Sequence, residues 1–177
     1  LNASSFTARV TASADSNPYQ VVIAGLAAIQ GIKHGGNTEQ VAALFREVGE
    51  PQHARAVIGE RLRRGARIPG FGHRLYPQGD PRAITLLNVV QQQFPNSPTL
   101  ALAQAISREG QTLIDRAPNI DLALVTMELA CSLPRGAALS IFALGRTAGW
   151  IGHAIEQYTT RSIIRPRARY VGKLPDK

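Results

Sequence analysis

The chain has 177 residues, of which 44% are hydrophobic and 18% are charged, and its formal net charge at pH 7 is +8. This balance excludes a disordered chain, because enough apolar surface is present to build a core. The single cysteine excludes an internal disulfide framework and indicates a reducing compartment, for which we expect the cytoplasm. No apolar run has the length of a membrane span, and the positive charge favours anionic partners.

Hydrophobic residues recur at helical spacing along most of the chain, and proline and glycine separate the runs. The first runs predict a tightly packed helix within residues 1–16, an almost wholly apolar and therefore buried helix over 18–30, and a helix capped by Asn37 or Thr38. Further helices are expected over 52–64, 81–94, 100–117, 120–129 and 137–160, followed by an extended basic tail over 163–172. Alternating strand patterns are missing, so the sequence predicts an all-α fold.

The loop Arg67–Tyr76 has the most informative local sequence, Arg-Ile-Pro-Gly-Phe-Gly-His-Arg-Leu-Tyr. Gly70 and Gly72 bracket Phe71, so the backbone can adopt conformations closed to other residues and can approach a ligand closely. His73 follows, with an ordinary pKa near physiological pH. A ligand-binding loop and a surface turn with a solvated histidine are both compatible with this pattern.

Three titratable residues occupy similar positions, each in a loop before a helix or at a helix start: His34, His73 and Asp121. The positive end of a helix disfavours imidazolium, so we expect His34 to be neutral and to donate one N–H to a carbonyl oxygen. The same field is expected to keep Asp121 ionised. A carboxylate with two imidazoles is suited to proton abstraction next to a carbonyl, although Asp121 by itself is equally explained as a capping residue.

Three arginines lie among apolar or small residues, where an unpaired charge is expensive: Arg82, Arg146 and Arg165. Asp80-Pro81 predicts an N-cap and a first helical position, which places Arg82 in the first turn of a helix. A guanidinium group binds a carboxylate through two hydrogen bonds, so the three arginines predict a di- or tricarboxylate ligand. The alternatives are a structural ion pair for Arg146 and a solvated tail for Arg165. No metal site is expected, because His, Cys and Asp do not cluster at ligand spacing.

In this order and spacing, the motifs resemble the C-terminal half of citrate synthases. The matching segments are Leu1–Phe6, Lys33–Gly36, Pro69–Tyr76, Asp80–Arg82, Pro118–Asp121 and Arg165–Arg167. The resemblance implies an almost wholly helical homodimer, in which residues 36–132 form a small domain while 1–35 and 133–177 belong to a large domain.

The resemblance also implies a role for each matching residue. Asp121 would be the base that deprotonates the acetyl-CoA methyl group, His34 the donor that stabilises the enol, and His73 the group that polarises the oxaloacetate ketone. The arginines expected to bind substrate carboxylates are Arg82, Arg146 and, in the partner subunit's site, Arg165. The loop expected to lie along CoA consists of Ile68, Pro69, Gly70, Phe71 and Gly72. No cofactor is implied besides the CoA thioester, which is a substrate.

Two departures from the family pattern indicate a divergent branch. Pro77 stands where many members carry a cation expected to help hold CoA phosphate, and Leu122-Ala123-Leu124 replaces the aromatic-Ser-Gly that commonly follows the aspartate. The family's remaining oxaloacetate-binding histidine is expected before Leu1, so we expect the chain to be a fragment with low activity by itself.

Other functions stay open at this point. A 2-methylcitrate synthase that uses propionyl-CoA would differ by one methylene, which leaves little trace in a sequence. A non-catalytic, citrate synthase-like binding or regulatory protein is the alternative from another class. A nucleic-acid binder is disfavoured, because the arginines are spread over helix faces and the tail with few interleaved aromatic residues.

Overall fold

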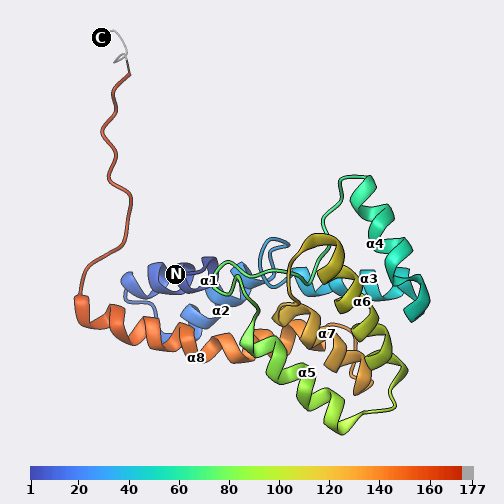
Figure 1. The fold of residues 1–177 in the computed structure, drawn as a ribbon. Helices are drawn as coiled ribbons and strands as arrows, with labels where there is room; N and C mark the ends of the chain where they lie inside the picture. Colours follow the sequence, from blue (N-terminus) through green and yellow to red (C-terminus); the bar gives the residue numbers. More distant parts are fainter. Residues whose placement is uncertain (173–177) are drawn as a thin grey trace. The chain divides into compact units, whose positions relative to one another are not determined.

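The computed structural model describes residues 1–172, and helices dominate this part of the chain (Figure 1). The helices are α1 (Ala3–Ser13), α2 (Pro18–Ile29), α3 (Asn37–Val48), the short 3₁₀ helix η1 (Pro51–His53), α4 (Ala54–Arg63), α5 (Pro81–Gln93), α6 (Pro98–Ile114), α7 (Ile120–Ala130) and α8 (Ala137–Thr160). Extended pairing within residues 1–172 is limited to one isolated antiparallel bridge between Phe71 and Pro118. The predicted all-α fold is therefore confirmed.

The helix boundaries follow local signals. Asp80 caps α5, and Pro81 and Pro98 lie in the first turns of α5 and α6, where a missing N–H costs nothing. We predicted a helix over 100–117 from the sequence. The observed helix α6 ends at Ile114, because Asp115 adopts a left-handed conformation with φ 51°. Among the helices of residues 1–172, none combines the length and apolar character that crossing a membrane requires.

The chain divides into two compact units, and α2 and α8 each pass from one unit into the other. Unit 1 consists of Leu1–Ala27 and Thr147–Lys177, and unit 2 consists of Ala28–Arg146. The domain limits expected from the family resemblance stay a prediction.

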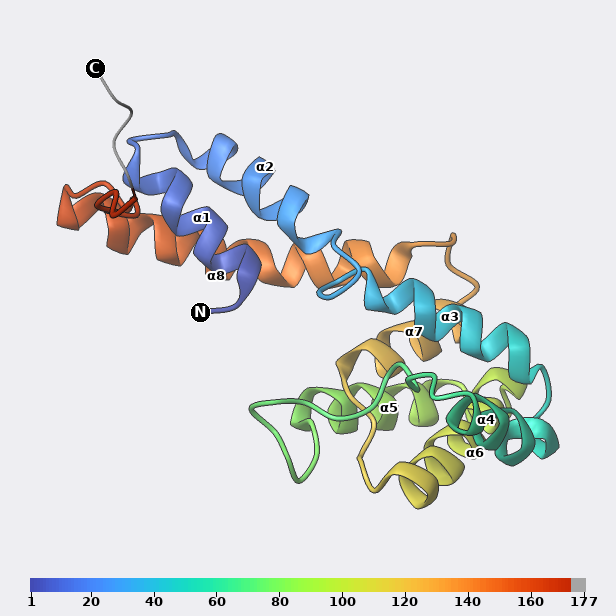
Figure 2. The ribbon, with the colours of Figure 1, turned by 90° about the horizontal axis from the view of Figure 1, so that it is seen from above.

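Unit 1 packs α1 and α2 against the C-terminal part of α8 (Figures 1 and 2). Trp150 is fully buried, and its indole Nε1–H donates to Ser4 Oγ on α1 at 3.1 Å. A Cβ at Gly25 of α2 would lie 2.6 Å from the Trp150 ring, so only glycine permits this approach. Arg9 of α1 donates to Gln157 Oε1 of α8 at 2.9 Å. Small residues thus allow the close helix packing that the sequence predicted for α1.

The exposure of α2 corrects one prediction. We expected a buried helix over 18–30, but Tyr19 is 82% and Ile23 is 65% exposed, and Leu26 on the same helix face is also exposed. Neighbours from one side only, including Trp150, cover α2 within unit 1. The apolar composition was read correctly, but a helix is buried all round only where other elements cover both of its faces.

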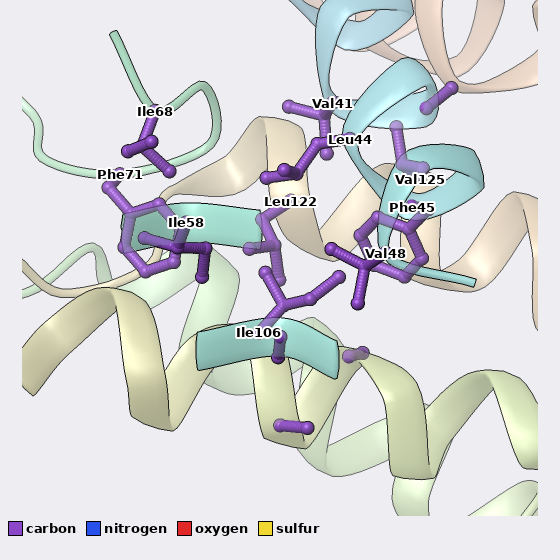
Figure 3. Close-up of a cluster of buried hydrophobic side chains, with 14 of the residues drawn as sticks. Val41, Leu44, Phe45, Val48, Ile58, Ile68, Phe71, Ile106, Leu122 and Val125 are labelled. Carbon is purple, nitrogen blue, oxygen red and sulfur yellow. The ribbon is translucent and has the colours of Figure 1, made fainter. Parts of the chain in front are cut away.

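Unit 2 encloses the main hydrophobic core (Figure 3). Side chains of α3 and α7 point into it together with residues from α4, α6 and the 67–76 loop, and the labelled members are Val41, Leu44, Phe45, Val48, Ile58, Ile68, Phe71, Ile106, Leu122 and Val125. The apolar positions predicted for the helix after residue 37 are confirmed as core residues. This core fixes the starts of α3 and α7, which carry the polar residues of the site.

Candidate active site

Asp121 lies in the first turn of α7. The Asn119 side chain caps this helix by accepting a hydrogen bond from the Asp121 N–H at 3.0 Å. The Asp121 carboxylate accepts a hydrogen bond through Oδ2 from Asn37 Nδ2 at 2.6 Å. Burial raises the pKa of Asp121, and the Asn37 hydrogen bond and the electrostatic interactions with Arg82 and His73 only partly oppose this.

One sequence prediction remains a prediction here, and another is corrected. We expected the positive end of the helix to keep Asp121 ionised, and this stays a prediction. The pKa of Asp121 moves upward, because burial of the carboxylate outweighs the surrounding hydrogen-bond donors and charges. We also expected Asn37 or Thr38 to cap α3. Gly36 is the N-cap residue and no side chain caps this helix, since the Asn37 amide is directed to Asp121.

Asp80 connects the start of α5 with the start of α7. Its side chain is fully buried and accepts hydrogen bonds from the Arg82 backbone N–H at 3.1 Å, from Arg82 Nε at 2.9 Å and from Nη2 at 2.8 Å. It also accepts the Ile120 N–H at 3.1 Å, next to Asp121. Burial opposes ionisation of Asp80, but the Arg82 hydrogen bonds and charge outweigh it, so the pKa of Asp80 is lowered. The hydrogen bond from Arg82 to Asp80 raises the pKa of Arg82 in turn.

His73 is held by its own loop. The Leu75 backbone N–H donates to His73 Nδ1 at 3.2 Å, so the neutral ring carries its proton on Nε2. The imidazole stacks on Tyr76 with ring centroids 4.8 Å apart, and the Arg82 guanidinium lies 5.4 Å from the centre of the Tyr76 ring. His73 and Arg82 therefore both contact the Tyr76 ring, and both interact electrostatically with Asp121.

The loop residues 68–72 are fixed by the core and by backbone pairing. Ile68 and Phe71 are at most 9% exposed, and a Cβ at Gly110 of α6 would lie 2.2 Å from Phe71 Cζ, so the ring sits directly on the glycine backbone. Gly72 N–H donates to Ala117 O at 2.8 Å, and Gly70 O accepts the Asn119 N–H at 2.9 Å. Gly70 and Gly72 have positive φ angles of 88° and 72°, as their predicted role requires.

His34 lies in the turns between α2 and α3. Its backbone N–H donates to Gly31 O at 2.8 Å, and its ring meets Phe142 edge-on with centroids 6.1 Å apart. Burial, and secondly the positive charge of Arg146 on α8, lower the pKa of His34. The predicted neutral imidazole is favoured, although the causes are burial and a cation rather than the helix terminus.

The candidate residues are therefore distributed as follows. Asp121 interacts electrostatically with both His73 and Arg82, and His34 interacts with Arg146. All five belong to unit 2, whereas Arg165 lies exposed in the extended segment of unit 1.

A model of the citrate synthase C-terminal domain matches residues 1–167 of this chain. The chain belongs to the citrate synthase family. A citrate synthase 2 from Bacillus subtilis is 34% identical over 184 residues, which cover 100% of this chain and 48% of that protein. A 2-methylcitrate synthase from Mycobacterium tuberculosis is 32% identical over 175 residues, covering 97% of this chain and 44% of the relative. This chain thus spans about half the length of the curated relatives it matches.

A solved citrate synthase structure has the same fold. The enzyme from Thermoplasma acidophilum, in a ternary complex with carboxymethyl coenzyme A and oxaloacetate, superimposes with a TM-score of 0.85 at 30% identity. The match covers 100% of this chain and 49% of the Thermoplasma chain. The family resemblance inferred from the motifs is confirmed.

In this citrate synthase family member, sequence reasoning missed two residues of the polar cluster. Asp80 was interpreted as a helix cap only, although it also binds the Arg82 guanidinium and the start of α7. The two-residue spacing of Asp80 and Arg82 was the available signal, because it permits an acidic cap to pair with a first-turn arginine. Asn37 was interpreted as a cap, and no local signal pointed to a partner 84 residues away.

A separate groove lies between α5 and α6. Its volume is about 440 Å³, and Leu87, Leu100, Ala103, Gln104 and Arg108 are among the residues that line it. None of the candidate catalytic residues is among the lining residues within the described part of the chain. Within residues 1–172, no group of three or more His, Cys, Asp or Glu side chains is arranged to hold a metal ion.

Proposed function

We propose that this chain supplies the C-terminal half of an acyltransferase that condenses a short acyl-CoA, in the first place acetyl-CoA, with oxaloacetate and then hydrolyses the thioester. The observation that carries the proposal is the interacting cluster of Asp121, His73 and Arg82 in a member of the citrate synthase family. A base, an N–H donor and a carboxylate-binding cation in one place are the groups that this condensation needs.

The first chemical step is proton abstraction from the acyl-CoA methyl group. Asp121 takes the proton, the electron pair of the broken C–H bond moves to the thioester carbonyl oxygen, and the N–H of neutral His34 stabilises the resulting enol. The raised pKa of Asp121 makes it a stronger base, and the lowered pKa of His34 keeps it a neutral donor.

The second step is carbon–carbon bond formation. The His73 Nε2–H polarises the oxaloacetate ketone, the enol carbon attacks it, and the new alkoxide takes up a proton from water. Water then cleaves the citryl thioester and releases CoA. Arg82, Arg146 and Arg165 bind the substrate carboxylates in this proposal. Since Asp80 accepts from Arg82 Nε and from one N–H of Nη2, both N–H groups of Nη1 and the second N–H of Nη2 remain for the substrate.

Loop residues 68–72 would contact CoA through the backbone. Ile68, Pro69, Gly70 and Phe71 are buried and Gly72 is partly exposed, so Gly72 is the residue of this loop that remains accessible to a ligand. No cofactor takes part in the proposed reaction, because the CoA thioester itself is the activated substrate.

A homodimer in the cytoplasm is the proposed state of the enzyme. The exposed face of α2 with Tyr19, Ile23 and Leu26 supports an apolar interface, since such a face is normally covered in solution. Arg165 in the extended segment would reach the partner subunit's site. Analytical ultracentrifugation of the wild-type protein and of an Ile23→Glu variant tests this proposal, with the variant expected to be monomeric.

Propionyl-CoA is the second candidate substrate, because 2-methylcitrate synthases are among the relatives. One methylene changes the discrimination between acyl-CoA substrates by only about 1–3 kcal/mol. Activity with both substrates is therefore expected, and the ratio of the two kcat/KM values identifies the preferred one.

The test is release of the CoA thiol, followed with a thiol reagent after mixing the full-length gene product with oxaloacetate and each acyl-CoA. Thiol release that requires oxaloacetate supports the proposal. Oxaloacetate binding by calorimetry without turnover of either acyl-CoA would instead support the non-catalytic binding protein. The 177-residue chain by itself is expected to be far less active, and citrate formation by it at the full-length rate would contradict this expectation.

A further inference from the structure

Asn37 links two segments that the proposed reaction uses together. It is the first residue of α3 and comes three residues after His34, whereas Asp121 is in the first turn of α7. The hydrogen bond from Asn37 Nδ2 to Asp121 Oδ2, at 2.6 Å, joins the two helix starts. An asparagine at the start of a helix usually accepts a hydrogen bond from its own helix, so an amide directed to another helix is an unusual use of this residue.

The surroundings of Asp121 show what this hydrogen bond contributes. Arg82 and His73 face the carboxylate as cationic or polar neighbours, and Asp80 faces it as a second carboxylate. Asn37 donates a hydrogen bond to the Asp121 side chain, whereas Arg82 Nε and Nη2 donate to Asp80. The orientation of the Asp121 carboxylate therefore depends on Asn37.

We propose that Asn37 is the positioning residue of the base: it holds Asp121 Oδ2 and thereby leaves Oδ1 as the oxygen that takes the substrate proton. This inference rests on the proposed function. In the step concerned, the substrate C–H bond breaks, an O–H bond forms at Oδ1, and the electron pair moves to the thioester oxygen opposite His34. Because Asn37 follows the His34 turn directly, its hydrogen bond to Asp121 connects the base with the segment that carries the enol-stabilising donor.

The hydrogen bond also stabilises the ionised form of Asp121 against its burial. A donor to a carboxylate lowers the pKa, so loss of the Asn37 amide is expected to raise the pKa of Asp121 further. Ionisation of the base would then require a higher pH, and the acidic limb of the kcat–pH profile would move upward with it.

Two variants separate this role from a contribution to folding. Asn37→Ala removes the donor. Asn37→Asp has the same shape and places a favourable acidic residue at the start of α3, but it presents acceptors to Asp121 instead of a donor. Asn88→Ala, at an exposed position of α5, is the matched control.

The first measurement uses the 177-residue chain and needs no turnover. The Asp121 carboxyl carbon is titrated by ¹³C NMR in wild type and variants. We expect its midpoint to move to higher pH in Asn37→Ala, further in Asn37→Asp, and not at all in Asn88→Ala.

The second measurement uses the full-length gene product. Since a small misplacement of a catalytic group lowers the rate strongly, kcat is expected to fall about tenfold to a hundredfold in Asn37→Ala, with the KM for oxaloacetate within about twofold of wild type. The acidic limb of kcat should shift in the same direction as the NMR midpoint, and Asn37→Gln should restore part of the rate.

The outcomes distinguish the inference from the function on which it rests. An inactive wild-type protein overturns the proposed function, whatever the Asp121 titration shows. An active wild type whose Asp121 midpoint and acidic limb are both unmoved in Asn37→Ala and Asn37→Asp overturns the role of Asn37. A loss of kcat without any shift of the acidic limb also overturns it, because a purely structural effect would produce that result.

Discussion

The start of α5 and the start of α7 each carry an aspartate, yet the two pKa values move in opposite directions. Asp80 is buried beside the Arg82 guanidinium and accepts four hydrogen bonds, from three Arg82 nitrogens and the Ile120 N–H, and its pKa is lowered. Asp121 accepts one side-chain hydrogen bond, from Asn37, and its pKa is raised. Asp80 is the N-cap residue of α5 and Asp121 lies in the first turn of α7 after the Asn119 cap, and the opposite pKa directions follow from pairing and burial.

The comparison separates a structural carboxylate from the proposed base. The lowered pKa of Asp80 favours its anionic form, which holds Arg82 and the Ile120 N–H of α7 through hydrogen bonds. A raised pKa makes Asp121 a stronger base, at some cost in stability. Ile120, which precedes Asp121 in the sequence, donates its N–H to Asp80, so the two aspartates belong to one hydrogen-bonded region. Variants of Asp80 and of Asp121 can therefore be compared directly.

The largest expected effect is on catalysis. Asp121→Asn in the full-length gene product should lower kcat by about 10²–10⁴-fold, because the general base is lost while the shape of the side chain is kept. Asp115→Asn, at the exposed end of α6, is the control and should leave kcat unchanged. Steady-state thiol release measures both, and a nearly full rate in Asp121→Asn would remove the base from the proposed mechanism.

Asp80→Ala should instead act on stability. It removes the cap of α5 and leaves the Arg82 side chain and the Ile120 N–H without their acceptor, so the free energy of unfolding of the 177-residue chain should fall by about 2–4 kcal/mol. Asp80→Asn keeps one acceptor oxygen and should cost less. Urea denaturation followed by circular dichroism measures the loss, and a change below about 0.5 kcal/mol in Asp80→Ala would contradict the structural role.

The packing of Phe71, in the 67–76 loop, against Gly110 of α6 provides the next test. Gly110→Ala places a Cβ against the Phe71 ring and should destabilise the chain by about 1–3 kcal/mol, because the packed ring has to move. Gly59→Ala in α4 meets nothing within 4 Å and should stabilise the chain by about 0.5–1 kcal/mol. If the two alanines have the same effect on the denaturation midpoint, Phe71 does not pack as described.

The pH dependence of stability should separate the two carboxylates directly. The lowered pKa of Asp80 contributes stability above the ordinary aspartate pKa, and this contribution is lost as the pH falls through the folded-state value. The raised pKa of Asp121 has the opposite sign: its ionised form costs stability at neutral pH, and the cost disappears as the pH falls through the raised value.

At pH 7, Asp121→Asn should therefore be more stable than wild type by on the order of 1 kcal/mol, whereas Asp80→Asn should be less stable. Both differences should shrink as the pH falls. Denaturation curves between pH 7 and the acid range measure them, and the same sign for both variants at pH 7 would refute the comparison.

The smallest expected effect concerns the pKa of the His34 imidazole, which is also set by burial and a neighbouring charge. Burial and the Arg146 charge lower the pKa of His34, so Arg146→Met should return this pKa part of the way toward its ordinary value. Titration of the His34 ring protons by NMR measures the change. No upward movement would mean that burial alone controls this imidazole.

The sequence by itself determined most of the fold. Apolar spacing together with Asp80-Pro81, Pro98 and Asn119 fixed the helices and several of their ends, because caps and helical periodicity are local properties. The spacing of the glycines and titratable residues was sufficient for the family. That His34, His73, Arg82, Asp121 and Arg146 share one compact unit was decided by the tertiary structure, since the expected domain limits divided them between a small and a large domain.

The tertiary structure decided what each polar side chain does. The Asn37 amide donates to Asp121 instead of capping α3, and Asp80 accepts a hydrogen bond from α7 in addition to capping α5. Burial raises the pKa of Asp121, whereas the positive end of a helix by itself would lower it. The exposed face of α2 could likewise not be predicted from the apolar composition of this helix. In each case the cause is a neighbour or a loss of water that arises only when distant segments meet, and a local pattern contains neither.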